Sequence, residues 1–451
     1  MKASPRISTL AAALLLCSAI FCSCQKAAAA HPGGAAKAEE FVFPGKPASP
    51  IEFLSTQLNP VEEAGKMRAI LLKDFPGQVD FRPNDSAFIY RQIDSLLKKD
   101  PGESILLGAL HGDFVKLYED GRLRNLDSVY EGLKGRSFTE SLLNLGRLDG
   151  KSLYYIPWMQ ATYVMAVNKK ALKYLPKGVD VGALTYDQLY DWSVAILQGT
   201  GKFALGLPAG EKGLMHRFLQ GYLYPSFTGS TLEKFRSPEA RAMWGYLKKL
   251  WRVTQPGSLN YSTMADPLLT DEVWIAWDHN ARLIKVFEQR PDDFIAIPSP
   301  IGPKGRGFMA VVSGLGIPAG VKAPKDPALL IDYLTRAAIQ ERTLAETGFF
   351  PVLATADDAG LSPGLRELAK AVREQSGSPL AVPTLLPIGL GERGDAYNNL
   401  FMLTFSDIVL GGGDVASILN ASAAKLQDIL NESRAGFWLP DKAGGRPGKI
   451  E

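Results

Sequence analysis

The feature that most constrains this chain is a repeated switch between strand-like and helix-like spacing of its apolar residues. Residues 51–54 form a short apolar run, and residues 61–75 then carry apolar side chains every three to four positions, as a helix with one buried face does. The pair recurs at residues 79–81 and 88–97, and a third apolar run covers residues 104–110. Because neighbouring parallel strands need crossover helices, this order predicts a mostly parallel sheet flanked by helices.

The same alternation resumes in the second half of the chain. Thr185 to Gln188 fits a capping box, and Ser237-Pro238 fits a helix N-cap followed by proline. Residues 271–277 alternate as a strand does, and the spacing becomes helical after Asp278. No tandem repeat of about 20 to 50 residues is present, which disfavours solenoids and propellers.

Length and composition bound the class of protein. With 451 residues, of which 46% are hydrophobic, the chain is too apolar for disorder and long enough for two lobes or domains. Its 50 basic and 47 acidic residues nearly balance, and no basic run stands out. We therefore expect no nucleic-acid partner, and the near-neutral charge fits an uncharged ligand.

The cysteines point to the N-terminus. All three, Cys17, Cys22 and Cys24, lie within the first 24 residues, which excludes a downstream disulfide framework, a Cys-ligated zinc or a catalytic thiol. Lys2 and Arg6 precede an apolar run that has the length of a signal-peptide core and is too short to span a bilayer. This segment predicts export from the cytoplasm.

Two modes of signal cleavage are compatible with this segment. Residues 21–24, Phe-Cys-Ser-Cys, resemble a bacterial lipobox, which favours cleavage before Cys24 and a lipid on its thiol. A general signal peptidase site at residues 27–30 is the alternative. Residues 24–47, rich in Ala, Pro and Gly, read as a flexible tether that would leave the folded part near a membrane.

Polar side chains follow the ends of four predicted strands. In open α/β sheets, ligands bind beyond the carboxyl ends of the strands. The residues there are Ser55, Thr56, Gln57 and Asn59; Asn84, Asp85 and Ser86; His111, Gly112 and Asp113; and Trp277, Asp278, His279 and Asn280. Amides and carboxylates bind sugar hydroxyls, and a tryptophan ring covers a sugar's apolar face. The structural alternative is that Asp85, Ser86 and Asp278 cap helices and that Trp277 is core.

The sequence gives little support for catalysis. The four histidines lack metalloprotease spacing, so we expect no metal site, and no GxSxG motif is present. Residues 389–394 match GxGxxG but follow a proline-broken run, so a loop is favoured over a dinucleotide site. Gly411 to Gly413 read as a linker between two helices. We expect no cofactor and no catalytic residue, although paired carboxylates leave a glycosidase or lyase open.

Six further segments carry motifs that belong together. Gly-Lys-Ser-Leu-Tyr-Tyr-Ile-Pro at 150–157 precedes Tyr-Val-Met-Ala-Val-Asn-Lys at 163–169. The others are residues 185–189 with 203–208, Pro-Ser-Pro-Ile-Gly-Pro-Lys-Gly-Arg at 298–306, Gly-Leu-Gly-Ile-Pro at 314–318, Glu-Thr-Gly-Phe-Phe-Pro at 346–351, and a helical pair at 398–430. In this order, over residues 48–435, they resemble the extracellular solute-binding proteins of carbohydrate ABC transporters, the group that includes maltose-binding protein.

The resemblance implies an α/β fold of the periplasmic binding protein type II class. Two lobes, each a mostly parallel sheet flanked by helices, would be joined by a hinge and close around a solute. The implied division is a signal peptide at 1–23, a tether at 24–47, lobe 1 at 48–162 plus 310–352, lobe 2 at 163–309 plus 353–435, and a C-terminal tail at 436–451.

The resemblance also implies a site and partners. By position, the solute contacts would be Gln57, Asn84, Asp85, Asp113, Trp158, Trp277, Asp278, His279 and Phe350. The ligand would be a sugar or oligosaccharide, and an ABC permease would receive it from a lipid-anchored monomer. A sensor that docks on a membrane receptor is the first alternative, a carbohydrate-active enzyme the second, and a polyol or phosphodiester ligand the third, although no Arg cluster is visible in the sequence to support a phosphate.

Overall fold

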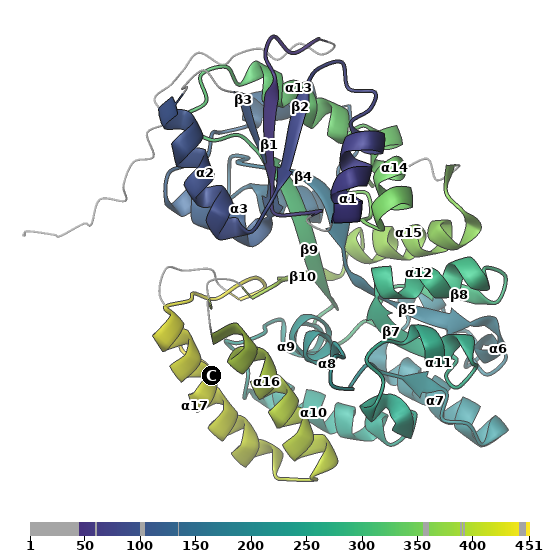
Figure 1. The fold of residues 1–451 in the computed structure, drawn as a ribbon. Helices are drawn as coiled ribbons and strands as arrows, with labels where there is room; N and C mark the ends of the chain where they lie inside the picture. The colour runs from purple at the N-terminus through teal and green to yellow at the C-terminus, as the bar shows by residue number, and fades with distance from the viewer. Residues whose placement is uncertain are drawn as a thin grey trace, which may run out of the picture.

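The chain forms two α/β lobes, one above the other in Figure 1. The computed structural model describes residues 45–58, 61–99, 104–133, 135–354, 360–387, 390, 393–441 and 448–451. The predicted signal peptide, the predicted lipidation site at Cys24 and nearly all of the predicted tether therefore lie outside the described residues. The α/β class predicted from the alternation of apolar spacing is confirmed, and so are the two lobes expected from the length of the chain and from the resemblance.

The first lobe is built on the predicted β-α-β-α-β unit. Its strands are β1 (Ile51–Ser55), β2 (Val79–Pro83), β3 (Ser104–Leu110), β4 (Ile156–Ala161) and the distal half of β9 (Arg306–Gly316). β1 pairs in parallel with β2 and β3, whereas β9 runs antiparallel to β3 and β4. All but the last residue of β3 are buried, which fits a central strand covered on both faces.

Helices cover both faces of the first sheet (Figure 1). They are α1 (Val61–Lys66), α2 (Ser86–Lys99), α3 (His111–Glu119), α4 (Asp127–Gly132), α5 (Glu140–Leu143), α13 (Lys325–Leu334) and α14 (Ala337–Thr347). A π-helical turn, Met67–Leu71, continues α1, so the apolar spacing predicted from residue 61 stays helical to Leu71 and ends before Phe75.

The second lobe corrects one expectation. Its sheet has the order β6 (Leu205–Gly206), β7 (Ile275–His279), β5 (Tyr163–Asn168) and β8 (Phe294–Ile297). Only β6 and β7 are parallel, because β5 runs antiparallel to both of its neighbours. The prediction of a mostly parallel sheet in each lobe is therefore wrong here: both sheets are mixed, and the chain enters this lobe by a strand that runs against the others.

Helices surround this second sheet. They are α6 (Lys169–Leu172), α7 (Tyr186–Thr200), α8 (Met215–Phe218), α9 (Tyr224–Thr228), α10 (Pro238–Trp251), α11 (Ala265–Leu269), α12 (Asn280–Gln289), α15 (Pro363–Ser376), α16 (Gly394–Phe405) and α17 (Val415–Ser433). The π-helical turns Leu219–Leu223 and Ser406–Leu410 extend α8 and α16.

The predicted capping box at Thr185 and Gln188 is confirmed, as is the cap by Ser237. The predicted strand at 271–277 begins later, at Ile275, because Asp271 occupies a left-handed turn (φ 59°).

Two strands carry the chain between the lobes. The first half of β9 pairs with β10 (Ala381–Leu385), and its second half joins the first-lobe sheet. β4 leads into β5 through buried Thr162, whose hydroxyl donates to the carbonyl of Met309 at 2.9 Å and accepts from the Gln375 amide at 3.0 Å. Hydrogen-bonding groups from three segments thus fix the crossing.

The segment predicted as a C-terminal tail packs on the second lobe. Phe437, Trp438 and Ile450 are buried, and Asp441 is 2% exposed. Its carboxylate accepts from the backbone N–H groups of residues 231–233 at 2.7 to 3.3 Å and from the Ser230 hydroxyl. The described residues of this segment are therefore part of the second lobe.

Candidate functional site

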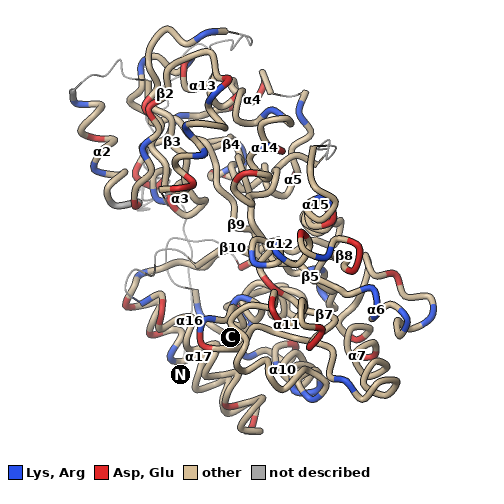
Figure 2. Tube along the Cα trace, turned by 45° about the vertical axis from the view of Figure 1, so that its right-hand side comes forward, with Lys and Arg blue, Asp and Glu red and all other residues tan. Residues whose placement is uncertain are grey.

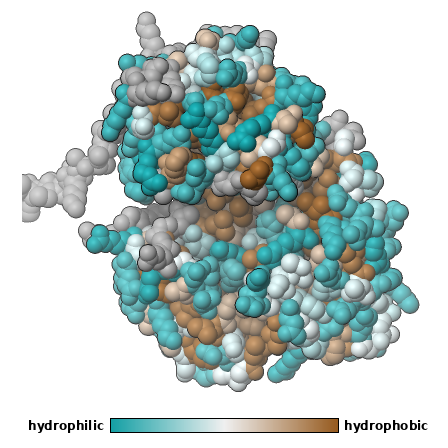
Figure 3. Space-filling view, viewed as in Figure 1, coloured by the Kyte–Doolittle hydropathy of each residue, from teal (hydrophilic) through white to brown (hydrophobic). Residues whose placement is uncertain are grey.

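A recess separates the two lobes on the face seen in Figure 3, with apolar side chains at its floor and polar ones along both rims. The carboxyl ends of β1, β2 and β3 border it from above (Figure 1). The carboxyl end of β7 and the short helix α8 border it from below. Charges of both signs are scattered over both lobes in Figure 2, and neither sign dominates a face.

The first-lobe rim brings together two predicted residues. The Thr56 hydroxyl donates to the Asp113 carboxylate at 3.1 Å and accepts from the Gln57 side-chain amide at 3.1 Å. These groups come from the ends of β1 and β3, which lie side by side because the strands are parallel. Gln57 and Asp113 are partly exposed, so both have surface left for a solute.

The other two first-lobe residues follow β2. The Asn84 backbone N–H donates to the Ser55 carbonyl at 2.9 Å, and its side-chain oxygen accepts from the Asp85 N–H. Asp85 is exposed and accepts from the Phe88 N–H at 2.8 Å, which caps α2. This cap uses one carboxylate oxygen, and no described residue donates a hydrogen bond to the other.

The second-lobe rim holds Asp278 and His279 at the end of β7. Asp278 is fully buried and accepts from the N–H groups of Met264 at 2.8 Å and His279 at 2.7 Å. Burial raises its pKa to about 6 despite these bonds. The His279 ring caps α12 by accepting from the Ala281 N–H at 3.3 Å, and burial, aided by Arg282, lowers its pKa to about 4.

The three predicted aromatic contacts are core residues in this structure. Trp158 is fully buried and packs on Phe53 in the first lobe, with ring centroids 5.5 Å apart. Trp277 is fully buried and stacks on Tyr163 at 4.8 Å with an interplanar angle of 4°. Phe350 is 1% exposed and pairs through its backbone with Gln160 at the crossing. None of the three offers a ring face to the recess, because all three side chains are buried in the core.

Sequence reasoning missed a polar cluster at α8. His216 and Arg217 lie on this four-residue helix, close enough to Arg282 and Tyr163 to influence one another's charge. Burial, with the two guanidinium groups, lowers the pKa of His216 to about 3, so the ring is neutral at pH 7. A helix this short has no apolar periodicity, and no local signal would have singled it out.

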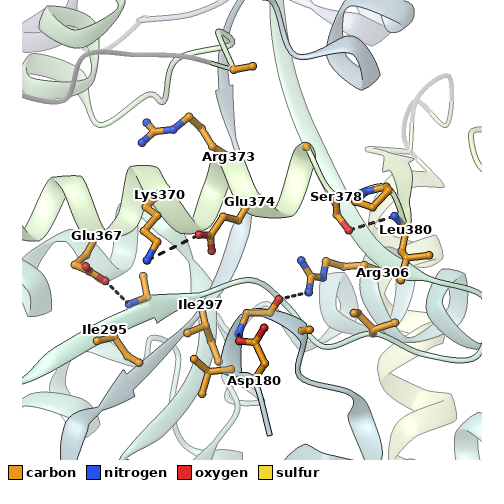
Figure 4. Close-up of a pocket in the computed structure, with 18 residues that line it drawn as sticks. Asp180, Ile295, Ile297, Arg306, Glu367, Lys370, Arg373, Glu374, Ser378 and Leu380 are labelled. Carbon is orange, nitrogen blue, oxygen red and sulfur yellow. Dashed lines mark hydrogen bonds and ion pairs between the residues drawn. The ribbon is translucent and has the colours of Figure 1, made fainter.

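A second cavity, of about 870 Å³, lies elsewhere in the second lobe (Figure 4). The edge strand β8, helix α15, the start of β10 and residues 180–183 line it. Its acidic and basic side chains balance: Asp180, Glu367 and Glu374 against Arg306, Lys370 and Arg373. None of the predicted site residues lines this cavity, and it is not bordered by the carboxyl ends of β1, β2, β3 and β7.

Neither a metal centre nor a membrane span is found in the described part of the chain. No group of three or more His, Cys, Asp or Glu side chains is placed to hold a metal ion among the described residues. No helix in the same residues is long and apolar enough to cross a bilayer.

His279→Asn is expected to make the stability of the protein less dependent on pH between about 4 and 6.5. The folded-state pKa of His279 lies below the ordinary 6.5, so on acidification the unfolded chain takes up a proton that the folded chain does not, and stability falls. Asparagine keeps the cap on α12 but does not titrate. Asp278, with its raised pKa, acts in the opposite sense and is common to both proteins. Urea unfolding at pH 7 and pH 5 should show the smaller loss in the variant, and equal losses would contradict the assignment.

Comparisons with known proteins agree with this geometry. The family model described as bacterial extracellular solute-binding protein matches residues 88–369. The sugar-binding protein MalE of Xanthomonas citri superposes with a TM-score of 0.67 at 16% identity, covering 86% of this chain and 98% of that one. The cyclic alpha-maltosyl-1,6-maltose binding protein of Arthrobacter globiformis gives 0.59 at 16% identity, covering 86% and 100%. UgpB of Mycobacterium tuberculosis, solved with glycerophosphocholine, gives 0.55 at 19% identity, covering 86% and 100%. No curated protein sequence matches the chain significantly.

Proposed function

We propose that this chain, which belongs to the bacterial extracellular solute-binding protein family, captures a saccharide between its lobes and delivers it to an ABC transporter permease. The observation that carries the proposal is the meeting of two sets of polar groups at one recess. Gln57 and Asp113 follow the carboxyl ends of β1 and β3, which border the recess from the first lobe, and His279 ends β7, which borders it from the second. A solute that contacts both lobes binds the closed form better and so shifts the equilibrium toward closure.

The structural neighbours support a saccharide as the solute class. The Xanthomonas and Arthrobacter proteins are named for sugar and cyclic maltosyl-maltose binding, and they share the fold over nearly their full length. Hydroxyl, amide and carboxylate groups at the first-lobe rim match the donors and acceptors of a sugar. Trp158, Trp277 and Phe350 are left out of the proposed contacts because they are core residues, and Asp278 is left out because both its oxygens serve the backbone.

Delivery to a permease places the protein outside the cytoplasm. A lipid on Cys24 would hold it at the membrane, and the following Ala-, Pro- and Gly-rich segment would let the lobes reach the permease as a monomer. Binding and closure need no covalent chemistry, so the proposed role has no catalytic residue and no cofactor.

A thermal-shift screen of the full chain in mild detergent tests the proposal. A saccharide present at 100 times its dissociation constant is expected to add about 2.7 kcal/mol to the free energy of unfolding, since it binds only the folded state. Mono- and oligosaccharides should be screened together, and bound sugars recovered and analysed for new reducing ends. No stabilisation by any saccharide would contradict the proposal, and new reducing ends would show an enzyme instead.

A further inference from the structure

Arg217 carries a positive charge for which the described part of the chain supplies no acidic partner. Its guanidinium is only partly exposed and donates from Nη1 to the neutral side-chain oxygen of Gln220 at 2.9 Å. The titratable groups that act on it, Tyr163 and Tyr397, have raised pKa values and are uncharged at pH 7, and burial lowers the pKa of Arg217. Arg136, which is similarly shielded, pairs with the Asp332 carboxylate. A shielded charge without a counter-charge lowers the stability of the fold. The presence of Arg217 at this position therefore needs an explanation other than stability.

Two other shielded arginines without an ion pair among the described residues are explained by the backbone. Arg124 donates to the carbonyl of Val321, and Arg306 donates to the carbonyl of Gly182. Each therefore fixes a loop. Among the described residues, the Arg217 guanidinium donates to no backbone carbonyl and is held by the Gln220 side-chain oxygen.

The surroundings of Arg217 add positive charge. The positive charges of Arg217 and Arg282 both act to lower the pKa of His216. The same two guanidinium groups act in the same direction on the pKa of the Tyr163 hydroxyl. Among the described residues, the carboxylate that acts on this tyrosine is Asp278, whose oxygens accept backbone N–H groups and lie 3.9 Å from Arg282 at the nearest. In the described part of the chain, two guanidinium groups are thus set against one carboxylate, an excess of one positive charge.

The Arg217 guanidinium is held in place by a second layer of hydrogen bonds through Gln220. Gln220 is 1% exposed, and its side-chain N–H donates to the Asn398 oxygen of α16 at 3.1 Å. This chain of bonds ties Arg217 to a second helix, and α8 itself borders the recess from below (Figure 1). A rigidly held, partly desolvated donor of this kind is suited to an anion that arrives with the solute.

We propose that Arg217 binds an anionic group of the solute, so that the captured saccharide is an acidic one. The planar fork of arginine can bind a carboxylate through two hydrogen bonds, and a carboxylate carries the single negative charge that the local excess of the described residues calls for, whereas a phosphate monoester brings up to two. The solute class is then a uronate or an oligosaccharide containing one. The inference rests on the proposed function, and it replaces the uncharged ligand suggested by the near-neutral composition.

The test uses matched disaccharides that differ only at C6. Titration calorimetry of the full chain in mild detergent compares uronate-containing and neutral members of glucose, galactose and mannose series. At least one acidic disaccharide is expected to bind more tightly than its neutral partner. Arg217→Gln is expected to weaken that binding by about 30-fold or more while changing neutral binding less than about threefold, because a desolvated charge pair is lost. Arg217→Lys should retain part of the affinity, as a charge without the fork.

Controls separate recognition from folding. Arg241→Gln, at an exposed position of α10, should change neither affinity nor stability. Arg217→Gln without ligand should unfold at the wild-type temperature or above it, because it removes a shielded charge without a counter-charge. An acidic preference that survives Arg217→Gln would overturn the proposal. Binding of the neutral disaccharides alone would also overturn the role of Arg217 but would leave the proposed capture of a saccharide intact. Binding of neither the acidic nor the neutral disaccharides would contradict both proposals.

Discussion

Trp277→Ala is expected to lower the free energy of unfolding by about 3–5 kcal/mol, the range for removing a large aromatic from a packed core. Its ring exposes no surface, stacks on Tyr163, and lies 4.9 and 5.0 Å from the ring centroids of Phe218 and Tyr222. Alanine would leave a cavity among the three remaining rings, which cannot all collapse into it. Urea unfolding at pH 7 measures the loss.

The size of this loss in stability decides whether Trp277 is a core residue or a contact of the solute. Trp251→Ala is the matched control, since this tryptophan is partly exposed and has one aromatic neighbour, Phe405. It should cost clearly less. A Trp277→Ala loss below about 1 kcal/mol, together with weaker saccharide binding, would restore the sequence prediction that this ring stacks on the sugar.

Asp441→Ala is expected to cost about 3 kcal/mol, because it leaves several buried donors without an acceptor. The carboxylate accepts from the backbone N–H groups of Thr231, Leu232 and Glu233, and from the Ser230 hydroxyl. These donors lie in one turn, and among the described side chains Asp441 is the one that accepts from all of them. Alanine would free both this turn and the C-terminal segment.

Asp414→Ala provides the comparison for Asp441. Asp414 is exposed and caps α17 by accepting from the Ser417 N–H at 2.8 Å, so its loss should cost clearly less than that of Asp441. Chemical denaturation of both variants gives the two values under the same conditions. Equal losses would mean that the Asp441 carboxylate contributes no more than an ordinary helix cap.

The elements that could be predicted are those with local signals. β3 follows from an unbroken apolar run, and α7 follows from its capping box and from Gly201, which ends it in a left-handed conformation (φ 71°). Strand direction in the second lobe has no such signal. β5 pairs with β7 and β8, which lie more than a hundred residues later, and only the assembled fold decides that these pairings are antiparallel.

The candidate site divides in the same way. The juxtaposition of Gln57 and Asp113 could be anticipated, since the ends of neighbouring parallel strands meet at one edge. Trp277 could not be assigned, because an aromatic at a strand end has the same pattern whether it packs inward or binds a sugar. Arg217 and Arg282 lie on separate helices, so their shared electrostatic surroundings arise only from tertiary packing.

Small-angle X-ray scattering of the full chain, with and without the saccharide that stabilises it most, tests the central claim most directly. Capture between the lobes predicts a smaller radius of gyration in the bound state. The dissociation constant fitted to this decrease should equal the one measured by calorimetry. The saccharide should be recovered chemically unchanged. A radius of gyration that stays constant while the saccharide is bound would contradict closure around the solute as the mechanism of this protein.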